Sequence, residues 1–242
     1  MSDPQEDKYI KALQLKKEKT EEYYRKSVVK TEQQKFLEQL LSNEGKKIEK
    51  IADIACGGGT LTFHLRQLYP SAAFTLLDFN PDAIQIAKEI NGDSCEYLTG
   101  SIYDLKEIKD NSFDLVCCWQ TLSWLDEPEK ALSELVRIAK PGGKIYASSL
   151  FNIHHDVDIW AKFHDHSGEK SAEYSYNTYA ASSVKKWLDG KAKAHRLHEF
   201  TPSIDFTYDG RGIGTFTVNS DKGKLQISAG YLMNWSILEI EK

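Results

Sequence analysis

The chain has 242 residues, 40% of them hydrophobic and 28% charged, and its 31 basic and 36 acidic side chains give a net charge of −5. This composition is typical of one folded, decorated domain. Nucleic-acid backbones require a positive protein face, so the acidic balance argues against a nucleic-acid partner. No apolar run reaches membrane-spanning length and no secretory leader is evident. We therefore expect a cytoplasmic protein without a membrane partner.

The chain carries four cysteines, Cys56, Cys95, Cys117 and Cys118. Cys117 and Cys118 are adjacent in an apparent strand, so their side chains should face opposite sides of a sheet. This spacing fits neither a disulfide framework nor a zinc site. We expect reduced thiols, with Cys117 and Cys118 in the core.

Strands and helices alternate through the first 151 residues. A helix expected over 8–42 would form an N-terminal helical cap at 1–45, ahead of a second unit at 46–242. We expect strands at 48–56, 73–78, 95–99, 113–119 and 145–151, and helices at 60–68, 81–91 and 128–139. Strands that alternate with helices pair in parallel through right-handed crossovers.

The last third of the chain changes character. Residues 152–180 are expected to be irregular, followed by a helix at 181–188 and by β-like runs at 195–208, 214–219, 224–229 and 235–240. Turn residues at 221–223 predict that the middle two runs form an inserted hairpin, while the outer two finish the main sheet. The expected fold is a three-layer α/β sheet, mostly parallel with an antiparallel C-terminal strand, with a variable substrate-side region at 152–234.

A glycine-rich turn directly follows the first expected strand and reads Asp53-Ile54-Ala55-Cys56-Gly57-Gly58-Gly59-Thr60. Such a turn presents bare backbone N–H groups at a helix N-terminus, where no side chain blocks a ligand. The acid precedes the glycines, a position that favours a positively charged cofactor over one that carries a pyrophosphate.

Polar or glycine-containing segments follow four of the expected strands. They are the glycine turn, Asp78, residues 100–102 and residues 119–120. In open parallel sheets, ligands bind beyond the carboxyl ends of the strands. All four segments should therefore converge on one ligand-binding edge.

Over residues 48–150, this pattern resembles the Rossmann-like (class I) S-adenosylmethionine-dependent methyltransferases. Residues 53–59 resemble the first motif of that family, with Ala55 where a glycine is usual, and Asp78 resembles its second acid. Residues 99–102 resemble the third motif, with Ser101 where aspartate is commoner. Segments 112–116 and 140–144 resemble the motifs around the fourth and fifth strands. The order and spacing of these motifs are specific.

The resemblance implies a Rossmann-like fold and S-adenosylmethionine as cofactor, and it assigns roles to residues. Asp53 would order the loop and favour the amino group of the methionine part, and Asp78 would accept hydrogen bonds from the ribose hydroxyls. The remaining implied contacts are Ala55, Cys56, Gly57 and Gly59 in the loop, Phe79 on the adenine face, Ser101 and Ile102 at the adenine edge, and Trp119 beside the methionine chain.

Two other functions stay open. A dinucleotide-binding oxidoreductase using NAD(P) would need a third small residue six positions into the turn, where this chain has Thr62. A phosphate-binding Walker loop would need Gly-Lys-Ser/Thr, which does not follow the glycines. A protein that binds S-adenosylmethionine without catalysis is the other alternative.

Residues for the methyl acceptor are expected outside these motifs. Four histidines lie between 154 and 166, and we favour a polar loop there over a metal site. His154 and His155 are the candidate catalytic bases. The expected substrate contacts are Tyr23, Tyr24, Trp124, Tyr176 and Asn177.

The segment after the fourth strand narrows the class of methyl acceptor. It reads Cys118-Trp119-Gln120-Thr121 and lacks both the Asn/Asp-Pro-Pro-Tyr element of certain amino-methyltransferases and a Pro-Cys nucleophile. With the acidic charge, this favours methyl transfer to oxygen or nitrogen of a small molecule, including sugar- or amino-acid-derived ones. The oligomeric state stays open.

Overall fold

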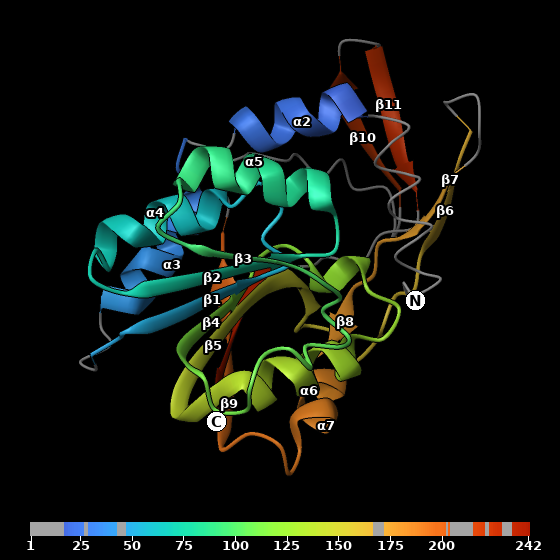
Figure 1. Cartoon of the computed structure of the whole chain (residues 1–242). Coiled ribbons are helices and arrows are strands. Elements are labelled where there is room, and N and C mark those ends of the chain that lie inside the picture. The colour runs from blue at the N-terminus through green and yellow to red at the C-terminus, as the bar shows by residue number, and fades with distance from the viewer. Residues whose placement is uncertain are drawn as a thin grey trace.

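The computed structural model describes residues 17–26, 29–42, 47–166, 172–201, 203, 215–220, 223–228 and 234–242. Helices cover both faces of a central sheet, so the molecule has three layers (Figure 1). The expected three-layer, Rossmann-like α/β fold is confirmed.

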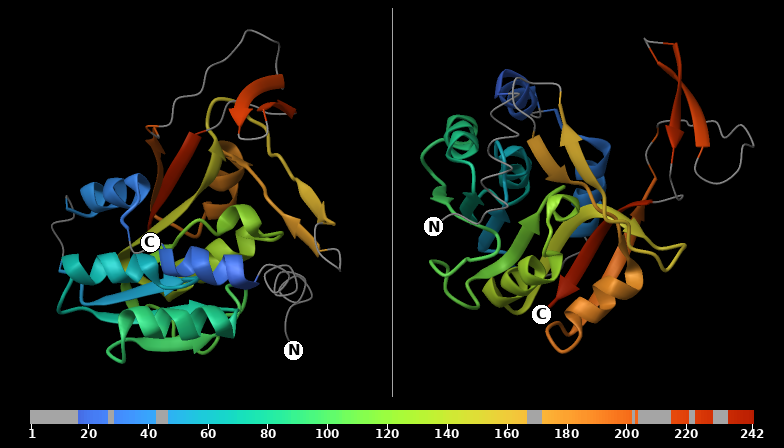
Figure 2. Two further views of the ribbon diagram at one scale, coloured as in Figure 1. Left: turned by 90° about the horizontal axis from the view of Figure 1, so that it is seen from above. Right: turned by 90° about the vertical axis from the view of Figure 1, so that its right-hand side faces the viewer.

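The main sheet has the strand order β3-β2-β1-β4-β5-β12-β9. The strands are β1 (Lys50–Ile54), β2 (Ala73–Asp78), β3 (Glu96–Thr99), β4 (Phe113–Cys118), β5 (Ala139–Asn152), β9 (Ala194–Phe200) and β12 (Asn234–Glu241). The first five strands of this order pair in parallel, whereas β12 is antiparallel to both of its neighbours. The antiparallel C-terminal strand is confirmed, and it lies inside the sheet between β5 and β9 (Figure 2).

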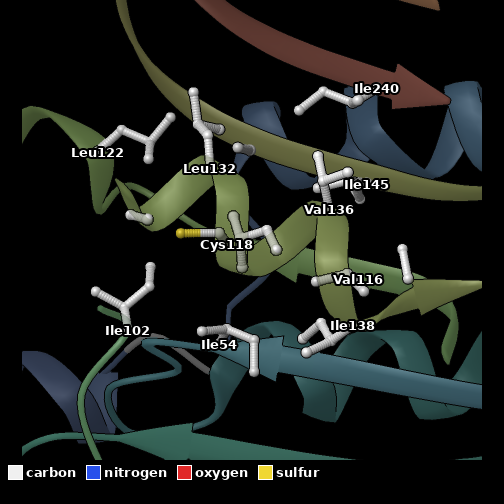
Figure 3. Close-up of a cluster of buried hydrophobic side chains, with 14 of the residues drawn as sticks. Ile54, Ile102, Val116, Cys118, Leu122, Leu132, Val136, Ile138, Ile145 and Ile240 are labelled. Atoms are coloured by element: carbon white, nitrogen blue, oxygen red, sulfur yellow. The ribbon is translucent and has the colours of Figure 1, made fainter. Parts of the chain in front are cut away.

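Two apolar clusters hold the layers together. On one face, α6 (Pro128–Ile138) and α7 (Ala181–Leu188) pack on the sheet, and Figure 3 shows Cys118 among the side chains of this cluster. On the other face pack α3 (Glu32–Ser42), α4 (Thr60–Leu68) and α5 (Pro81–Asn91), with Cys117 in their cluster. The two cysteines are fully buried on opposite faces, as expected, and all four cysteines are free thiols.

The local sequence explains where α5 begins and ends. Asn80 caps the helix, because its side-chain oxygen accepts a hydrogen bond from the Asp82 N–H at 3.0 Å, and Pro81 occupies the first turn. Gly92 follows the last turn with a φ of 72°, a conformation that suits glycine. The loop from β2 into α5 is thereby fixed directly after Asp78.

The N-terminal region differs from its prediction. One continuous helix over 8–42 is wrong, because the chain forms α2 (Lys17–Lys26) and then α3, with non-helical residues at 29–31; residues 8–16 lie outside the described part. Thr31 caps the second helix. Its hydroxyl oxygen accepts from the Gln34 N–H at 3.2 Å, and Gln34 Oε1 accepts from the Thr31 N–H at 2.9 Å. This reciprocal capping box fixes the start of α3.

The region from 152 to 180 is more regular than expected. It contains β6 (Lys162–Asp165) and β7 (Ala172–Ser175), which pair as an antiparallel arm, and the short strand β8 (Tyr179–Ala180). Strands of two to four residues are too short for a period-2 pattern to stand out, which explains the miss.

The expected inserted hairpin is confirmed. Strands β10 (Thr215–Ser220) and β11 (Gly223–Ser228) pair only with each other, in antiparallel register. Strand β9 ends at Phe200, and most of the predicted continuation to 208 lies outside the described residues. None of the helices in the described part of the chain is long and apolar enough to cross a membrane.

Candidate active site

The loop between β1 and α4 is tightly packed and has a backbone conformation that favours glycine. Ala55, Gly57 and Gly59 all have positive φ angles, of 58°, 52° and 70°. A Cβ at Gly59 would lie 2.7 Å from the Asn91 side-chain nitrogen and 3.0 Å from the Ala87 Cβ, so only glycine fits there. The side chain of Asn91 also donates to the Gly59 carbonyl at 2.9 Å. The loop is thus held from α5, and no side chain among the described residues caps the N-terminus of α4.

Asp53 is a buried carboxylate at the start of this loop. One of its oxygens accepts from the Thr62 hydroxyl at 2.7 Å, whereas Oδ1 has no hydrogen-bond partner within the described residues. Burial raises the pKa of Asp53 to about 6. A buried, half-satisfied carboxylate is costly unless a ligand compensates it, and a positively charged group would do so.

Asp78 lies at the end of β2 and ties the neighbouring backbone together. Its Oδ2 accepts from the Gly57 N–H at 2.8 Å and its Oδ1 from the Asn80 N–H at 2.9 Å. The Cys56 N–H donates to the Leu77 carbonyl at 3.0 Å, so the loop is pinned to β2 at two points. Asp78 is 4% exposed. Since each carboxylate oxygen has two lone pairs, this carboxylate has the capacity to bind ligand hydroxyls as well.

The expected adenine residues sit at the ends of β2 and β3. The Gly100 N–H donates to the Asp78 carbonyl at 3.0 Å, which places the 100–102 segment beside Asp78. The Ser101 hydroxyl accepts from the Tyr103 N–H at 3.1 Å, and Phe79 is half-buried. Ile102 is 6% exposed and packs in the apolar cluster with Ile54 (Figure 3).

The end of β4 carries an arrangement that the sequence motifs do not reveal. Trp119 is half-buried against the α3–α4–α5 cluster, and Gln120 has a φ of 54°. The Gln120 N–H donates to the Ser148 hydroxyl at 2.8 Å, and its side-chain amide donates to Gln33 Oε1 of α3 at 3.1 Å. A positive φ outside glycine often marks a functional site, and here it lies on the ligand-binding edge.

Helix α2 lies over the glycine loop. A Cβ at Gly57 would be 3.0 Å from the Tyr24 ring, and one at Gly58 would be 2.8 Å from the Tyr24 Cβ. Arg25 pairs with Glu89 of α5 at 2.8 Å, which anchors the helix there. The structure therefore places Tyr24 against the glycine loop, and the side chain of Tyr23 lies outside the described part.

Aromatic side chains gather between the end of β4 and the β6–β7 arm. The Trp124 ring lies 4.6 Å from that of Tyr176 and 5.9 Å from that of Tyr174. The Tyr174 ring in turn stacks on Phe163 at 5.2 Å, and Phe163 is 43% exposed. This row starts four residues after Gln120 and runs outward along the arm.

Asn177 fixes that row to the sheet edge. Its N–H donates to the Ser123 carbonyl at 2.6 Å, and its side chain donates to the Leu125 carbonyl at 3.0 Å and accepts from the Ala161 N–H at 3.1 Å. With 1% exposure, Asn177 acts here as a main-chain clamp. It thereby holds the chain segments around Trp124 and Tyr176 together, and its expected contact with substrate stays a prediction.

His154 and His155 lie in an exposed bend directly after β5. The His155 N–H donates to the Asn152 side chain at 3.1 Å, which shapes the bend. His164 is separate from them, on the arm, 3.2 Å from Glu173. In the described part of the chain, no three His, Cys, Asp or Glu side chains form a group suited to a metal ion.

Comparisons with known proteins match methyltransferases. A family model described as a methyltransferase domain matches residues 52–147. An uncharacterized methyltransferase of Schizosaccharomyces pombe is 30% identical over 63% of this chain and 60% of its own length. A malonyl-[acyl-carrier protein] O-methyltransferase of Hahella chejuensis is 26% identical over 75% of this chain and 66% of its own length.

Among solved structures, DhpI in complex with SAH (S-adenosylhomocysteine) matches with a TM-score of 0.57 at 15% identity. The match covers 85% of this chain and 81% of DhpI, and at this identity it establishes the fold alone. The chain spans 60 to 66% of the length of the two curated relatives above.

Proposed function

We propose that the protein is a Rossmann-like, S-adenosylmethionine-dependent methyltransferase, as the match of residues 52–147 to a methyltransferase domain supports, and that it transfers a methyl group to oxygen or nitrogen of a small molecule. One observation carries the proposal. A glycine loop that admits no Cβ at Gly59 lies between two buried carboxylates, Asp53 and Asp78. This combination suits a ligand with a cationic amino-acid end and a sugar.

Different residues of this edge contact different parts of the cofactor. Gly57 and Gly59 let the main chain close on the methionine part, near the carboxylate of Asp53, and Trp119 flanks it. Asp78 accepts hydrogen bonds from the ribose hydroxyls. Phe79, Ser101 and Ile102 border the adenine, with Ala55 and Cys56 supplying loop backbone. When bound, S-adenosylmethionine supplies a sulfonium-activated methyl group, so the main task of the protein is alignment.

The acceptor would lie beyond the end of β4, between α2 and the arm. Trp124 and Tyr176 would contact it, Asn177 would position them, and Tyr24 would close the cofactor side. His154 or His155 would act as base where the attacking atom must lose a proton. The O-methyltransferase name of the Hahella relative supports oxygen as an acceptor atom.

The acceptor class rests on charge and on motifs. The net charge of −5 favours a small molecule, including sugar- or amino-acid-derived ones, over nucleic acid. The proposed setting is the cytoplasm, without a membrane partner.

Calorimetric titration with S-adenosylhomocysteine tests the cofactor assignment. Wild-type protein should bind it, and Asp78→Ala should weaken binding by about 1–3 kcal/mol through lost charged hydrogen bonds. Unchanged affinity in Asp78→Ala would contradict the assignment. NAD(H) should give no heat; binding of NAD(H) alone would favour the oxidoreductase alternative.

Labelled S-adenosylmethionine tests catalysis. Incubation with a metabolite extract should move the label into a small-molecule product, whose identity names the acceptor. Cofactor binding without label transfer to any acceptor pool would favour a non-catalytic binding protein.

A further inference from the structure

The side-chain amide of Gln33 is a buried hydrogen-bond donor at the ligand-binding edge. Gln33 is 5% exposed, and its Oε1 accepts from the Gln120 side chain at 3.1 Å. That bond fixes the direction of the Gln33 amide. Its Nε2 is buried and has no hydrogen-bond partner within the described residues.

A buried N–H without an acceptor is costly, and native proteins keep few of them. Packing of α3 does not require this one, because the buried leucines Leu37 and Leu41 already seat the helix on the sheet. Gln33 also lies outside the matched residues 52–147, so no motif accounts for it. A ligand that supplies an oxygen would explain its retention.

Gln33 and Asp53 belong to the same face of the sheet. Asp53 is in register with Cys117 of β4, and directly opposed residues on neighbouring strands point to the same side. Cys117 packs in the cluster that α3 and α4 cover, and Gln33 is on α3. Strands β1 and β4 are neighbours, so Gln120, just past the end of β4, is near the loop that follows Asp53.

The two residues therefore offer opposite and complementary polar atoms. Asp53 Oδ1 is an acceptor without a donor, and Gln33 Nε2 is a donor without an acceptor. An α-amino-acid group carries an ammonium and a carboxylate two bonds apart through one carbon. Such a zwitterion would satisfy an acidic oxygen on one side and an amide N–H on the other.

We infer that Gln33 donates a hydrogen bond to the carboxylate of the methionine end of S-adenosylmethionine, with Gln120 holding its amide in place. This assignment rests on the proposed function. It makes Gln33 a cofactor-binding residue contributed by α3, ahead of the methyltransferase domain.

Two ligands that differ in the amino-acid part test the assignment. S-adenosylhomocysteine carries the carboxylate, and 5′-methylthioadenosine keeps the nucleoside and sulfur without it. Calorimetric titration of Gln33→Met should show about a tenfold loss of affinity for S-adenosylhomocysteine, the value expected for a hydrogen bond to a charged group. Affinity for 5′-methylthioadenosine should not change.

A matched control is Gln39→Met, the same substitution at an exposed position of the same helix. It should leave both affinities unchanged. Equal affinity of wild type and Gln33→Met for S-adenosylhomocysteine would overturn the inference, and so would an equal loss for both ligands. Wild-type protein that binds neither ligand would instead overturn the proposed function, and the inference with it.

Folding of the variant is checked by thermal unfolding without ligand. Gln33→Met should unfold near the wild-type temperature, because the substitution removes an unsatisfied buried donor and, with it, the acceptor of the Gln120 side-chain amide. Should the variant fail to fold, the wild-type protein with ¹⁵N-labelled glutamine answers the question. A buried glutamine NH₂ signal should shift with S-adenosylhomocysteine and stay in place with 5′-methylthioadenosine; no differential shift would overturn the inference.

Discussion

The two halves of the ligand-binding edge are built in different ways. At the ends of β1 and β2, Asp78 ties the glycine loop to the main chain, for example through the Gly57 N–H at 2.8 Å, and Asp53 is held by the Thr62 hydroxyl at 2.7 Å. At the end of β4 and along the arm, side chains from distant segments meet each other, as Trp124 meets Tyr176. The first half depends mainly on hydrogen bonds around the glycine loop, whereas the second combines packing between aromatic rings with the main-chain hydrogen bonds of Asn177. Under the proposed function, the first half would bind the cofactor and the second half the acceptor.

The largest expected effect is on the first half of the edge, at the ends of β1 and β2, which we call the cofactor half; the second half is the acceptor half. Gly59→Ala should lower the free energy of unfolding by about 4 kcal/mol, because a Cβ adds left-handed backbone strain and overpacking against Asn91. Urea denaturation measures this. The control Gly190→Ala has a similar φ of 67° but no atom within 4 Å of the added Cβ, so strain alone should cost about 1 kcal/mol. Equal losses in the two variants would contradict the close packing of the loop.

The second prediction concerns Asp53 and pH. Its folded pKa of about 6 lies above the ordinary value of 3.8, so the folded state holds an extra proton between these values. Stability from this group is therefore present below about pH 4 and is lost as the pH rises through 6, by about 2–3 kcal/mol in all. The Asp53→Asn variant has no titratable group at this position, so its stability should not fall in this way as the pH rises.

The measurement is chemical denaturation of both proteins from pH 4 to 7, without cofactor. The difference in unfolding free energy, variant minus wild type, should rise across that window and then level off. A difference that does not change with pH would show that burial does not raise the pKa of Asp53.

The third prediction sharpens the contrast by perturbing the acceptor half alone. Trp124→Ala should cost about 1 kcal/mol of stability through its lost ring contacts, and it should strongly reduce label transfer to the acceptor pool. Affinity for S-adenosylhomocysteine should stay at the wild-type value. Trp160→Ala, at a 53% exposed ring on the same region, is the control and should retain transfer. A matching loss of cofactor affinity in Trp124→Ala would show that the halves are not separate.

The smallest effect on stability is expected at the bend after β5. His154→Gln and His155→Gln replace exposed side chains and should change the unfolding free energy by less than about 0.5 kcal/mol. One of them should nevertheless lower kcat by about 100-fold if that residue is the base. The control His164→Gln, on the arm, should leave kcat unchanged. If both bend variants keep the wild-type kcat, neither His154 nor His155 is the base.

Much of the fold was predictable because its signals are local. The buried run at 113–118, the glycine turn and the Asn80-Pro81 helix start each depend on neighbouring residues, and the structure has them where expected. The break before α3 was missed although its Thr31–Gln34 capping box is written in the sequence. Charged residues on both sides of the break made residues 8–42 resemble one continuous helix.

The candidate site was predictable only in part, because some of its residues follow local motifs and others meet only through tertiary packing. Asp53 and Asp78 stand at fixed distances from the glycines, and the fold brings them together. The pairing of Gln33 with Gln120 joins residues 87 positions apart and follows no spacing rule. Such a contact depends on how α3 packs over the sheet, which periodicity does not specify.

The place of β12 has a consequence for the order of folding. Seven residues of β12 pair with β9 and eight pair with β5, and β9 has no other strand partner among the described residues. During synthesis, which proceeds from the N-terminus, strands β1 to β5 can associate as soon as they emerge. Strand β9 must wait for a segment made later, so its hydrogen-bonding edge stays uncovered until then. Nascent chains halted before residue 234 should accordingly be the ones that depend most on chaperones.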